Sequence, residues 1–183
     1  MPENISCPKC NLNLNTRTKI NKHTYEHVDN DPINPILEVN SKDWKNMLPR
    51  IVAHEYHHSV WISRNFKTIH FSLLDCLILE GRAEGFAQLI YPNIEAPWPF
   101  FLSGIKEHMV WEKIKQNLHS KDEQLIMKMI IGDSDIPFLS LYSMGYCIMQ
   151  EFLKNNSDVS ILEWTDMKPE DIMSRSKYDE KFN

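Results

Sequence analysis

A nearly continuous apolar run between residues 73 and 90 is the feature that most limits how this chain can fold. Its length and composition predict one long, buried helix, with Ser72 as its N-cap. Two carboxylates, Glu80 and Glu84, lie one turn apart within the run. A buried carboxylate needs a partner, so the pair indicates an ion or a histidine on the element opposite. The alternative is an ion pair with a surface cation such as Arg82, although Arg82 lies two positions from each carboxylate and points elsewhere.

Two glycines, Gly81 and Gly85, interrupt the same run. Glycine lowers helix propensity by about 1 kcal/mol relative to alanine. It also has no Cβ, and its absence lets another backbone come close. We therefore expect a second segment of the chain to approach this helix at the glycines.

A second motif precedes the run: residues 51–58 read Ile-Val-Ala-His-Glu-Tyr-His-His and contain His-Glu-x-x-His. His54 and His58 are four residues apart, so on a helix they share one face and can bind one metal ion. Glu55 lies about a hundred degrees further round the helix, within reach of a water held on that metal. Catalytic zinc requires neutral nitrogen ligands, an open coordination position and a nearby carboxylate base. Solvated helices without a metal also carry such pairs, but the apolar residues on both sides of this motif favour a buried setting.

Together the two motifs resemble those of the gluzincin metallopeptidases, in which His-Glu-x-x-His is followed about twenty residues later by Glu-Gly-x-Ala-Glu. The chain most resembles a bacterial family of predicted zinc-dependent proteases, over roughly residues 34–155. The resemblance implies that His54, His58 and Glu80 bind zinc and that Glu55 is the general base. It also implies that Glu84 orients a histidine ligand, and a carboxylate four residues after Glu80 faces the neighbour that this role requires.

Residues 1–30 contain a separate cluster of candidate metal ligands, outside the part that carries the resemblance. Cys7 and Cys10 are followed by His23 and His27, which gives the spacing Cys-x2-Cys-x12-His-x3-His of a zinc finger. A segment this short and polar buries little surface and would need a metal to fold. The cluster therefore predicts a second, structural zinc, and the alternative is a flexible arm with incidental cysteines and histidines.

Composition excludes several classes of protein. The chain has 183 residues, enough for one domain with a core and a small appendage, and a net charge of −5, which makes nucleic acid an unlikely partner. It contains no glycine-rich dinucleotide motif and no P-loop. The N-terminus does not resemble a signal peptide, and no apolar stretch reaches ~18 residues without a charge. We therefore expect a cytoplasmic protein that does not span a membrane.

The rest of the chain is predicted to be mostly helical. Residues 35–40 read as a short strand, and 36–39 would be an edge strand that holds an extended substrate. Pro49 suits the first position of the helix that bears His54. His57 points about a third of a turn from His54 and is expected to support a ligand or face solvent. Further helices are expected at about 101–118, 122–131, 138–154, 158–165 and 169–176.

These observations predict an α+β fold that is mainly α. A zincin-like metallopeptidase domain would span residues 31–183, with a small N-terminal β element and a helical C-terminal part, after a finger-like segment at residues 1–30. In the expected reaction on a peptide or protein substrate, Glu55 takes a proton from the attacking water and passes it to the leaving amine. Tyr146 or Tyr142 is a candidate donor to the oxyanion, and for each the alternative is simple packing in the core.

Two other classes of protein remain open at this point. One is a binding module, in which the N-terminal finger docks a partner and the downstream helices form a scaffold without catalysis. The other is a structural helical protein without a metal. The number of zinc ions per chain distinguishes them: two for a finger and an enzyme, one for an enzyme alone, and none for a structural protein.

Overall fold

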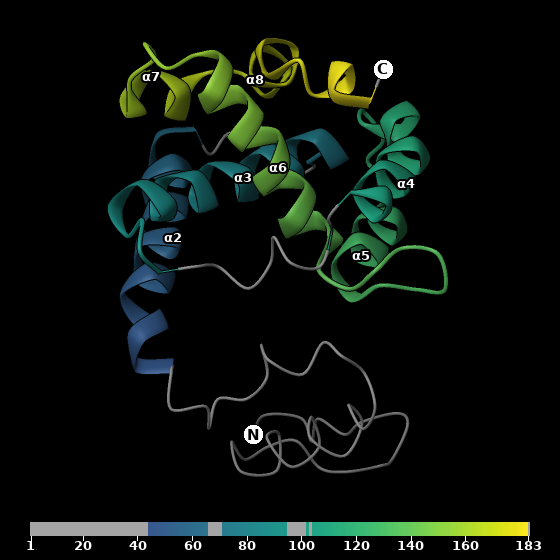
Figure 1. Ribbon diagram of the computed structural model, residues 1–183, viewed down its shortest axis with the longest axis horizontal. Helices are drawn as coiled ribbons and strands as arrows, with labels where there is room; N and C mark the ends of the chain where they lie inside the picture. The colour runs from purple at the N-terminus through teal and green to yellow at the C-terminus, as the bar shows by residue number, and fades with distance from the viewer. Residues whose placement is uncertain (1–43, 66–70, 95–101, 103, 183) are drawn as a thin grey trace. The chain divides into compact units, whose positions relative to one another are not determined.

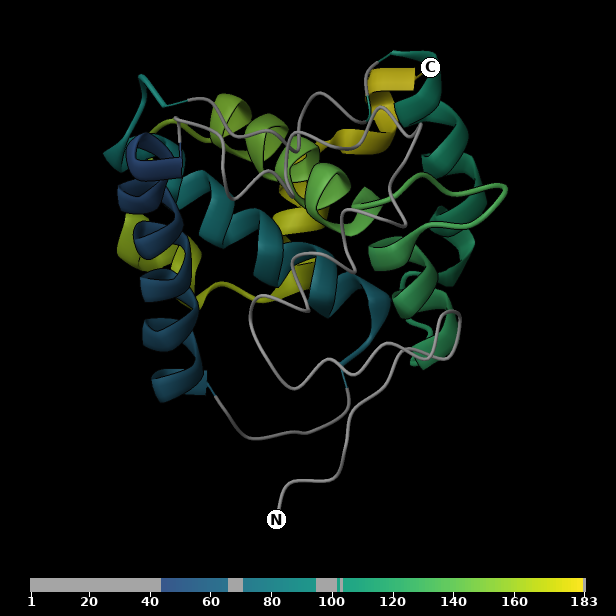
Figure 2. The same cartoon turned by 90° about the horizontal axis from the view of Figure 1, so that it is seen from below.

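The computed structural model describes residues 44–65, 71–94, 102 and 104–182. The described part is built of helices, which Figures 1 and 2 show in two orientations. In chain order they are α2 (Trp44–Asn65), α3 (Leu73–Ile90), α4 (Ile105–Ile114), the 3-10 turn η2 (Lys115–Asn117), α5 (Glu123–Ile131), α6 (Ser140–Asn155), α7 (Ile161–Asp166), α8 (Pro169–Ser176) and the 3-10 turn η3 (Tyr178–Phe182).

The expectation of an α+β fold with a small N-terminal β element is wrong for this part of the chain. The residues described here contain no strand. Their core is formed by helices packed on helices, so no sheet is needed to bury the apolar faces. The strand expected at 36–39 and the finger-like segment at residues 1–30 lie outside the described residues.

Helix α3 is the central element of the described unit, as its apolar sequence predicts. Leu73 and Ala87, near its two ends, are both fully buried. Ser72 is its N-cap: the hydroxyl accepts a hydrogen bond from the backbone N–H of Asp75, and the Asp75 carboxylate accepts one from the backbone N–H of Ser72. This reciprocal capping box satisfies two N–H groups that a helix start leaves without partners. The predicted bounds of this helix and its predicted cap are both confirmed.

The backbones of α3 and α6 touch where the two helices cross (Figure 1). A Cβ added to Gly81 would lie 2.3 Å from the carbonyl oxygen of Gly145, and one added to Gly145 would lie 2.3 Å from the carbonyl oxygen of Leu77. No side chain fits at such distances, so the crossing requires glycine on both helices. The close approach expected at Gly81 is therefore confirmed, and its partner is Gly145 on α6.

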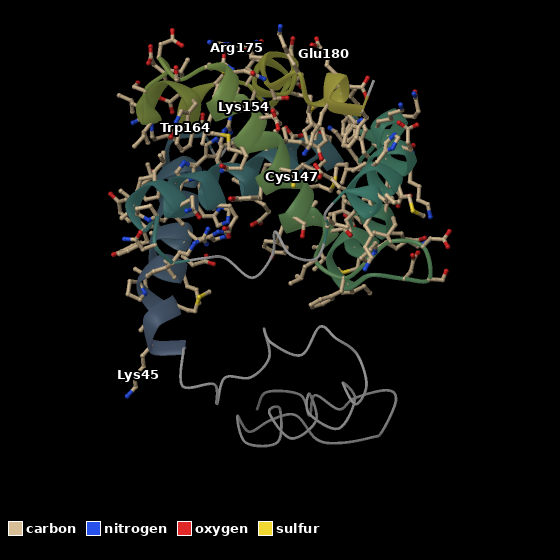
Figure 3. All side chains as sticks on the ribbon, viewed as in Figure 1. Lys45, Cys147, Lys154, Trp164, Arg175 and Glu180 are labelled. Carbon is tan, nitrogen blue, oxygen red and sulfur yellow. The ribbon has the colours of Figure 1, made fainter. Side chains whose placement is uncertain are left out.

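The helices around this crossing complete the core. Large apolar side chains from several helices are fully buried, among them Trp111 of α4, Phe152 of α6 and Trp164 of α7. Figure 3 shows Cys147 midway along α6 and Trp164 on α7. The core also includes Leu74, Leu77, Ile78, Ile114, Met129, Met144, Ile148, Ile172 and Tyr178.

Most predicted helices lie where the sequence placed them, with shifted ends. Helix α4 begins only at Ile105, because Gly104 before it has a φ of 56°, outside the helical region. Pro49 is not the first residue of its helix but lies inside α2, which begins at Trp44. Proline there removes one backbone hydrogen bond near the start of α2. Among the described helices, none is long and apolar enough to cross a membrane.

The crossing of α3 and α6 gives a first testable prediction. We expect Gly145→Ala to lower the free energy of unfolding by about 1–3 kcal/mol or more, because a methyl group must push two backbones apart. Gly85→Ala is the matched control, since its Cβ would meet the flexible side chain of Met149 at 3.0 Å rather than a backbone. Alanine also favours a helix by about 1 kcal/mol, so the control is expected to be close to neutral. Urea unfolding of the two variants measures the difference, and equal midpoints would contradict the prediction.

Candidate metal centre

Helices α2 and α3 bring together the three side chains that are predicted from the sequence to be metal ligands. Nε2 of His54 lies 2.9 Å from Nε2 of His58. One carboxylate oxygen of Glu80, Oε2, lies 3.3 Å from the first nitrogen and 3.4 Å from the second. Each residue thus offers a ligand atom, and these atoms all lie within 4.8 Å of one another. The two histidines come from one turn of α2, and the glutamate faces them from α3.

The spacing and chemistry of these atoms fit zinc. Two ligand atoms that are each about 2.0–2.1 Å from one tetrahedral zinc are separated by about 3.3 Å, close to the distances found here. Two imidazole nitrogens and one carboxylate oxygen also form a common donor set of catalytic zinc sites. The side chains of His54, His58 and Glu80 are exposed by 8%, 14% and 16%. The cluster is therefore mostly buried but still open to solvent on one side.

Glu84 contacts His54 from the side away from the other candidate ligands. Its Oε1 lies 2.7 Å from Nδ1 of His54, the ring nitrogen that the metal would not use. Its Oε2 lies 2.7 Å from Nη2 of Arg50, one turn before His54 on α2. The Arg50 and Glu84 side chains are only 1% and 0% exposed. Sequence reasoning missed Arg50, although its place four residues before His54 puts it on the same face of the helix.

The charges of the cluster are strongly coupled. Burial alone would lower the pKa of His54, but its interactions with Glu80 and Glu84 raise that pKa to about 9. Burial would raise the pKa of Glu80, but His54 and His58 lower it to about 2. In the absence of a metal, a proton on His54 therefore balances part of the negative charge. A metal requires the neutral imidazole, so metal binding would release this proton.

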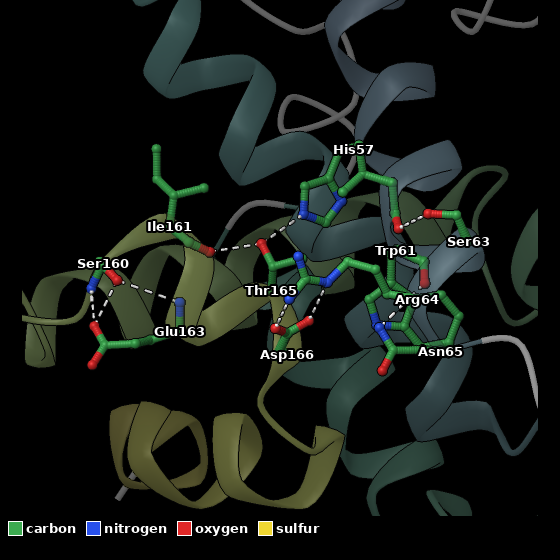
Figure 4. Close-up of polar contacts among 11 residues, drawn as sticks. His57, Trp61, Ser63, Arg64, Asn65, Ser160, Ile161, Glu163, Thr165 and Asp166 are labelled. Atoms are coloured by element: carbon green, nitrogen blue, oxygen red, sulfur yellow. Dashed lines mark hydrogen bonds and ion pairs between the residues drawn. The ribbon is translucent and has the colours of Figure 1, made fainter.

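His57 lies beside the candidate ligands in sequence but belongs to a different contact. Its side chain is buried and stacks on Trp164. Its Nε2 lies 3.2 Å from the hydroxyl oxygen of Thr165, a contact drawn in Figure 4. That hydroxyl donates to the carbonyl of Ile161 at 2.6 Å, so His57 donates its Nε2–H to Thr165. Burial and the charges of His58 and Arg82 lower the pKa of His57 to about 4, so the ring is neutral near pH 7. The expectation that His57 supports a ligand or faces solvent is therefore wrong: it is a buried residue that anchors α7.

Two arginines fasten α7 to the helices of the site. Arg64 of α2 makes a two-pronged ion pair with Asp166 of α7, shown in Figure 4. Arg82 of α3 donates to the carbonyl of Met167, which ends α7. This contact overturns the alternative in which Arg82 pairs with Glu80 or Glu84. Glu84 instead pairs with a histidine and an arginine of α2.

The candidate general base and the two tyrosines lie around the same cluster. Glu55 is exposed, beside His54 on α2. Burial raises the pKa of Tyr142 on α6 to about 12, and the charges of Glu80, Glu55 and Glu84 add to the effect. Burial also raises the pKa of Tyr146, while the charge of Arg50 opposes the rise. The charge of Glu84 thus affects the pKa of both tyrosines, whereas Glu80 and Glu55 affect only that of Tyr142.

The N-terminal cluster cannot be compared with the structure. Cys7, Cys10, His23 and His27 lie outside the described residues, so a finger with a structural zinc stays a prediction.

Comparison with known proteins places the chain in a family. A model of the family described as "Predicted Zn-dependent protease (DUF2268)" matches residues 15–174, most of the chain. The chain belongs to this family. The match includes His54, His58 and Glu80, whose geometry suits the zinc that the family description implies. The finer resemblance to gluzincins is not established by this match.

One curated protein is similar to the chain, and no solved structure matches it. The relative is "Uncharacterized protein YjfC" of Bacillus subtilis (strain 168), 26% identical over 140 residues. The alignment covers 70% of this chain and 46% of the relative, so the chain spans about half the length of that protein.

The two carboxylates of α3 are expected to differ in their effect on zinc affinity. Glu80→Ala removes an atom placed beside both imidazole nitrogens, whereas Glu84→Ala removes a contact to the far side of His54. We expect Glu84→Ala to weaken zinc binding by about ten- to a hundred-fold, and Glu80→Ala to weaken it much more. Competition with a chelating indicator measures both dissociation constants, and thermal unfolding shows whether each variant is folded. The reverse ranking would exchange the two roles.

Proposed function

We propose that this chain is a zinc-dependent metallopeptidase in which His54, His58 and Glu80 hold the metal. The observation that supports this most directly is the convergence of two imidazole nitrogens and one carboxylate oxygen from α2 and α3. Zinc bound there would polarise a peptide carbonyl and make water a better nucleophile at neutral pH. Three protein ligands leave a fourth position open, which catalysis requires and a structural zinc site lacks.

In this proposal Glu55 is the general base. It follows His54 directly on α2, and its exposure leaves it accessible to water and substrate. Glu55 takes a proton from the water as that water attacks the peptide carbonyl. It then passes the proton to the nitrogen of the leaving amine, which cannot depart as an anion.

Tyr142 is the better of the two candidate donors to the oxyanion. Burial raises its pKa, and the charges of Glu80, Glu55 and Glu84 add to the rise, which supports a place for its hydroxyl near the candidate ligands. A pKa of about 12 also keeps that hydroxyl protonated and able to donate. Burial also raises the pKa of Tyr146, but the charge of Arg50 opposes that rise and neither Glu80 nor Glu55 contributes to it, which supports a place for Tyr146 further from the candidate ligands.

In the proposed site Glu84 contacts His54 at the ring nitrogen that the metal would not use. Its Oε1, 2.7 Å from Nδ1 of His54, is placed to accept the ring N–H. This contact would fix the tautomer in which Nε2 carries a lone pair toward the metal. The site therefore uses one carboxylate of α3 as a ligand and the other to orient a ligand.

Replacement of the general base tests the proposed chemistry. We expect Glu55→Gln to bind zinc with unchanged affinity and to lose peptidase activity by at least about a hundred-fold, because the amide cannot accept the proton. Activity is measured on an unfolded, fluorescently labelled protein, and the metal content by elemental analysis. Hydrolysis at the wild-type rate would show that Glu55 is not the base, and wild-type protein without bound zinc would end the proposal.

The tyrosines can be compared as a matched pair. We expect Tyr142→Phe to lower kcat by about 10²–10³-fold with little change in KM, because a donor to the oxyanion acts mainly in the transition state. Tyr146→Phe removes the same hydroxyl one turn along α6 and is expected to leave kcat nearly unchanged. A larger loss from Tyr146→Phe would assign the donor to that residue.

A further inference from the structure

We infer that Arg50 is a positioning residue of the metal centre, which acts on His54 through Glu84. The inference rests on the proposed zinc site and adds a residue that neither motif contains. Arg50 would hold the Glu84 side chain in one orientation, and Glu84 would hold the ring of His54 in the tautomer that binds metal.

The contacts form a continuous chain from Arg50 to the candidate ligands. One carboxylate oxygen of Glu84 lies 2.7 Å from Nη2 of Arg50, and the other lies 2.7 Å from Nδ1 of His54. The opposite ring nitrogen of His54 lies 3.3 Å from Glu80. Each end of the Glu84 carboxylate is therefore engaged, so the carboxylate cannot turn without breaking one of two short contacts.

Burial makes the arginine necessary to Glu84. The Glu84 side chain has no exposed surface, and a buried carboxylate is costly unless it is paired. Arg50 lies within ion-pair distance of it, and the arginine side chain is itself only 1% exposed, so the pair is shielded from water. With one oxygen of Glu84 held by Arg50, the other faces Nδ1 of His54 and can accept its N–H, which leaves the lone pair of Nε2 for a metal.

The geometry also suits arginine in particular. Arg50 lies one turn before His54 on α2, so both side chains point from the same helix face toward Glu84 on α3. Its planar head places Nη2 within ion-pair distance of one oxygen and leaves the other oxygen for the histidine. Arg64, on the same helix, makes an exposed ion pair with Asp166 and contacts none of the candidate ligands. It provides a control for the loss of an arginine from α2.

A double-mutant cycle on the full chain tests the inference. The variants are Arg50→Met, Glu84→Gln, the double variant with both changes, Arg50→Lys, and the control Arg64→Met. Zinc dissociation constants come from competition with a chelating indicator. Cobalt(II) added to metal-free protein reports ligand geometry through its visible absorption, and urea unfolding reports stability separately.

We expect Arg50→Met to weaken zinc binding by about ten- to a hundred-fold and to change the cobalt spectrum, with partial recovery in Arg50→Lys. In the Glu84→Gln background, loss of Arg50 is expected to cost no further affinity, because the carboxylate through which it acts is already gone. Arg64→Met should bind both metals like the wild type.

The double variant keeps the test decisive if Arg50→Met alone does not fold, because it removes both buried charges together. A double variant that binds zinc about tenfold more weakly than Glu84→Gln would overturn the inference. So would an Arg50→Met protein that folds and binds both metals like the wild type. Wild-type protein that binds zinc but cleaves no peptide would contradict the proposed function and leave Arg50 its role, whereas wild-type protein that binds no zinc would overturn both.

Discussion

The backbone contact between Gly81 and Gly145 is the constraint on which the rest of the described structure depends. It fixes α3 against α6 along one line of α3, and the two carboxylates lie at the positions just before Gly81 and Gly85. Adjacent residues of a helix point about a hundred degrees apart. Glycines that face α6 therefore turn Glu80 and Glu84 away from it and toward α2. The packing of the core thus determines which helix receives the carboxylates, and that helix carries His54 and His58.

The candidate site consists of ionisable side chains that pair with one another in a largely apolar interior. Arg50, His54 and His58 bring nitrogen atoms from α2, and Glu80 and Glu84 bring oxygen atoms from α3. Each group on its own would be costly to bury, and each lies within ion-pair distance of another. The partners of Glu84 and of Glu80 differ, however. Glu84 is enclosed between two partners of α2, whereas Glu80 shares an oxygen with two nitrogens that a metal can also use.

Local sequence patterns predict much of this arrangement. The contacts that they do not predict join residues far apart in the sequence. The apolar run at 73–90, its cap at Ser72 and the one-turn spacings of His54 with His58 and of Glu80 with Glu84 depend on residues a few positions apart. The sequence predicts a histidine ligand as the partner of Glu84, and the structure adds Arg50, a contact that depends on how α2 crosses α3. The bond from His57 to Thr165 joins residues more than a hundred positions apart and has no local signal. The β element was inferred from a short apolar segment outside the described residues, and nothing in the described core requires it.

A crossing set by main-chain atoms makes the site robust to mutation of the core. Where two helices are spaced by side chains, a change of volume shifts one helix along the other. Here Gly81 and Gly145 set the spacing, so exchanges among Met144, Ile148 and Met149 can adjust locally without moving α6 along α3. Sequence drift in the apolar interior is thereby uncoupled from the position of the helix that carries the two carboxylates.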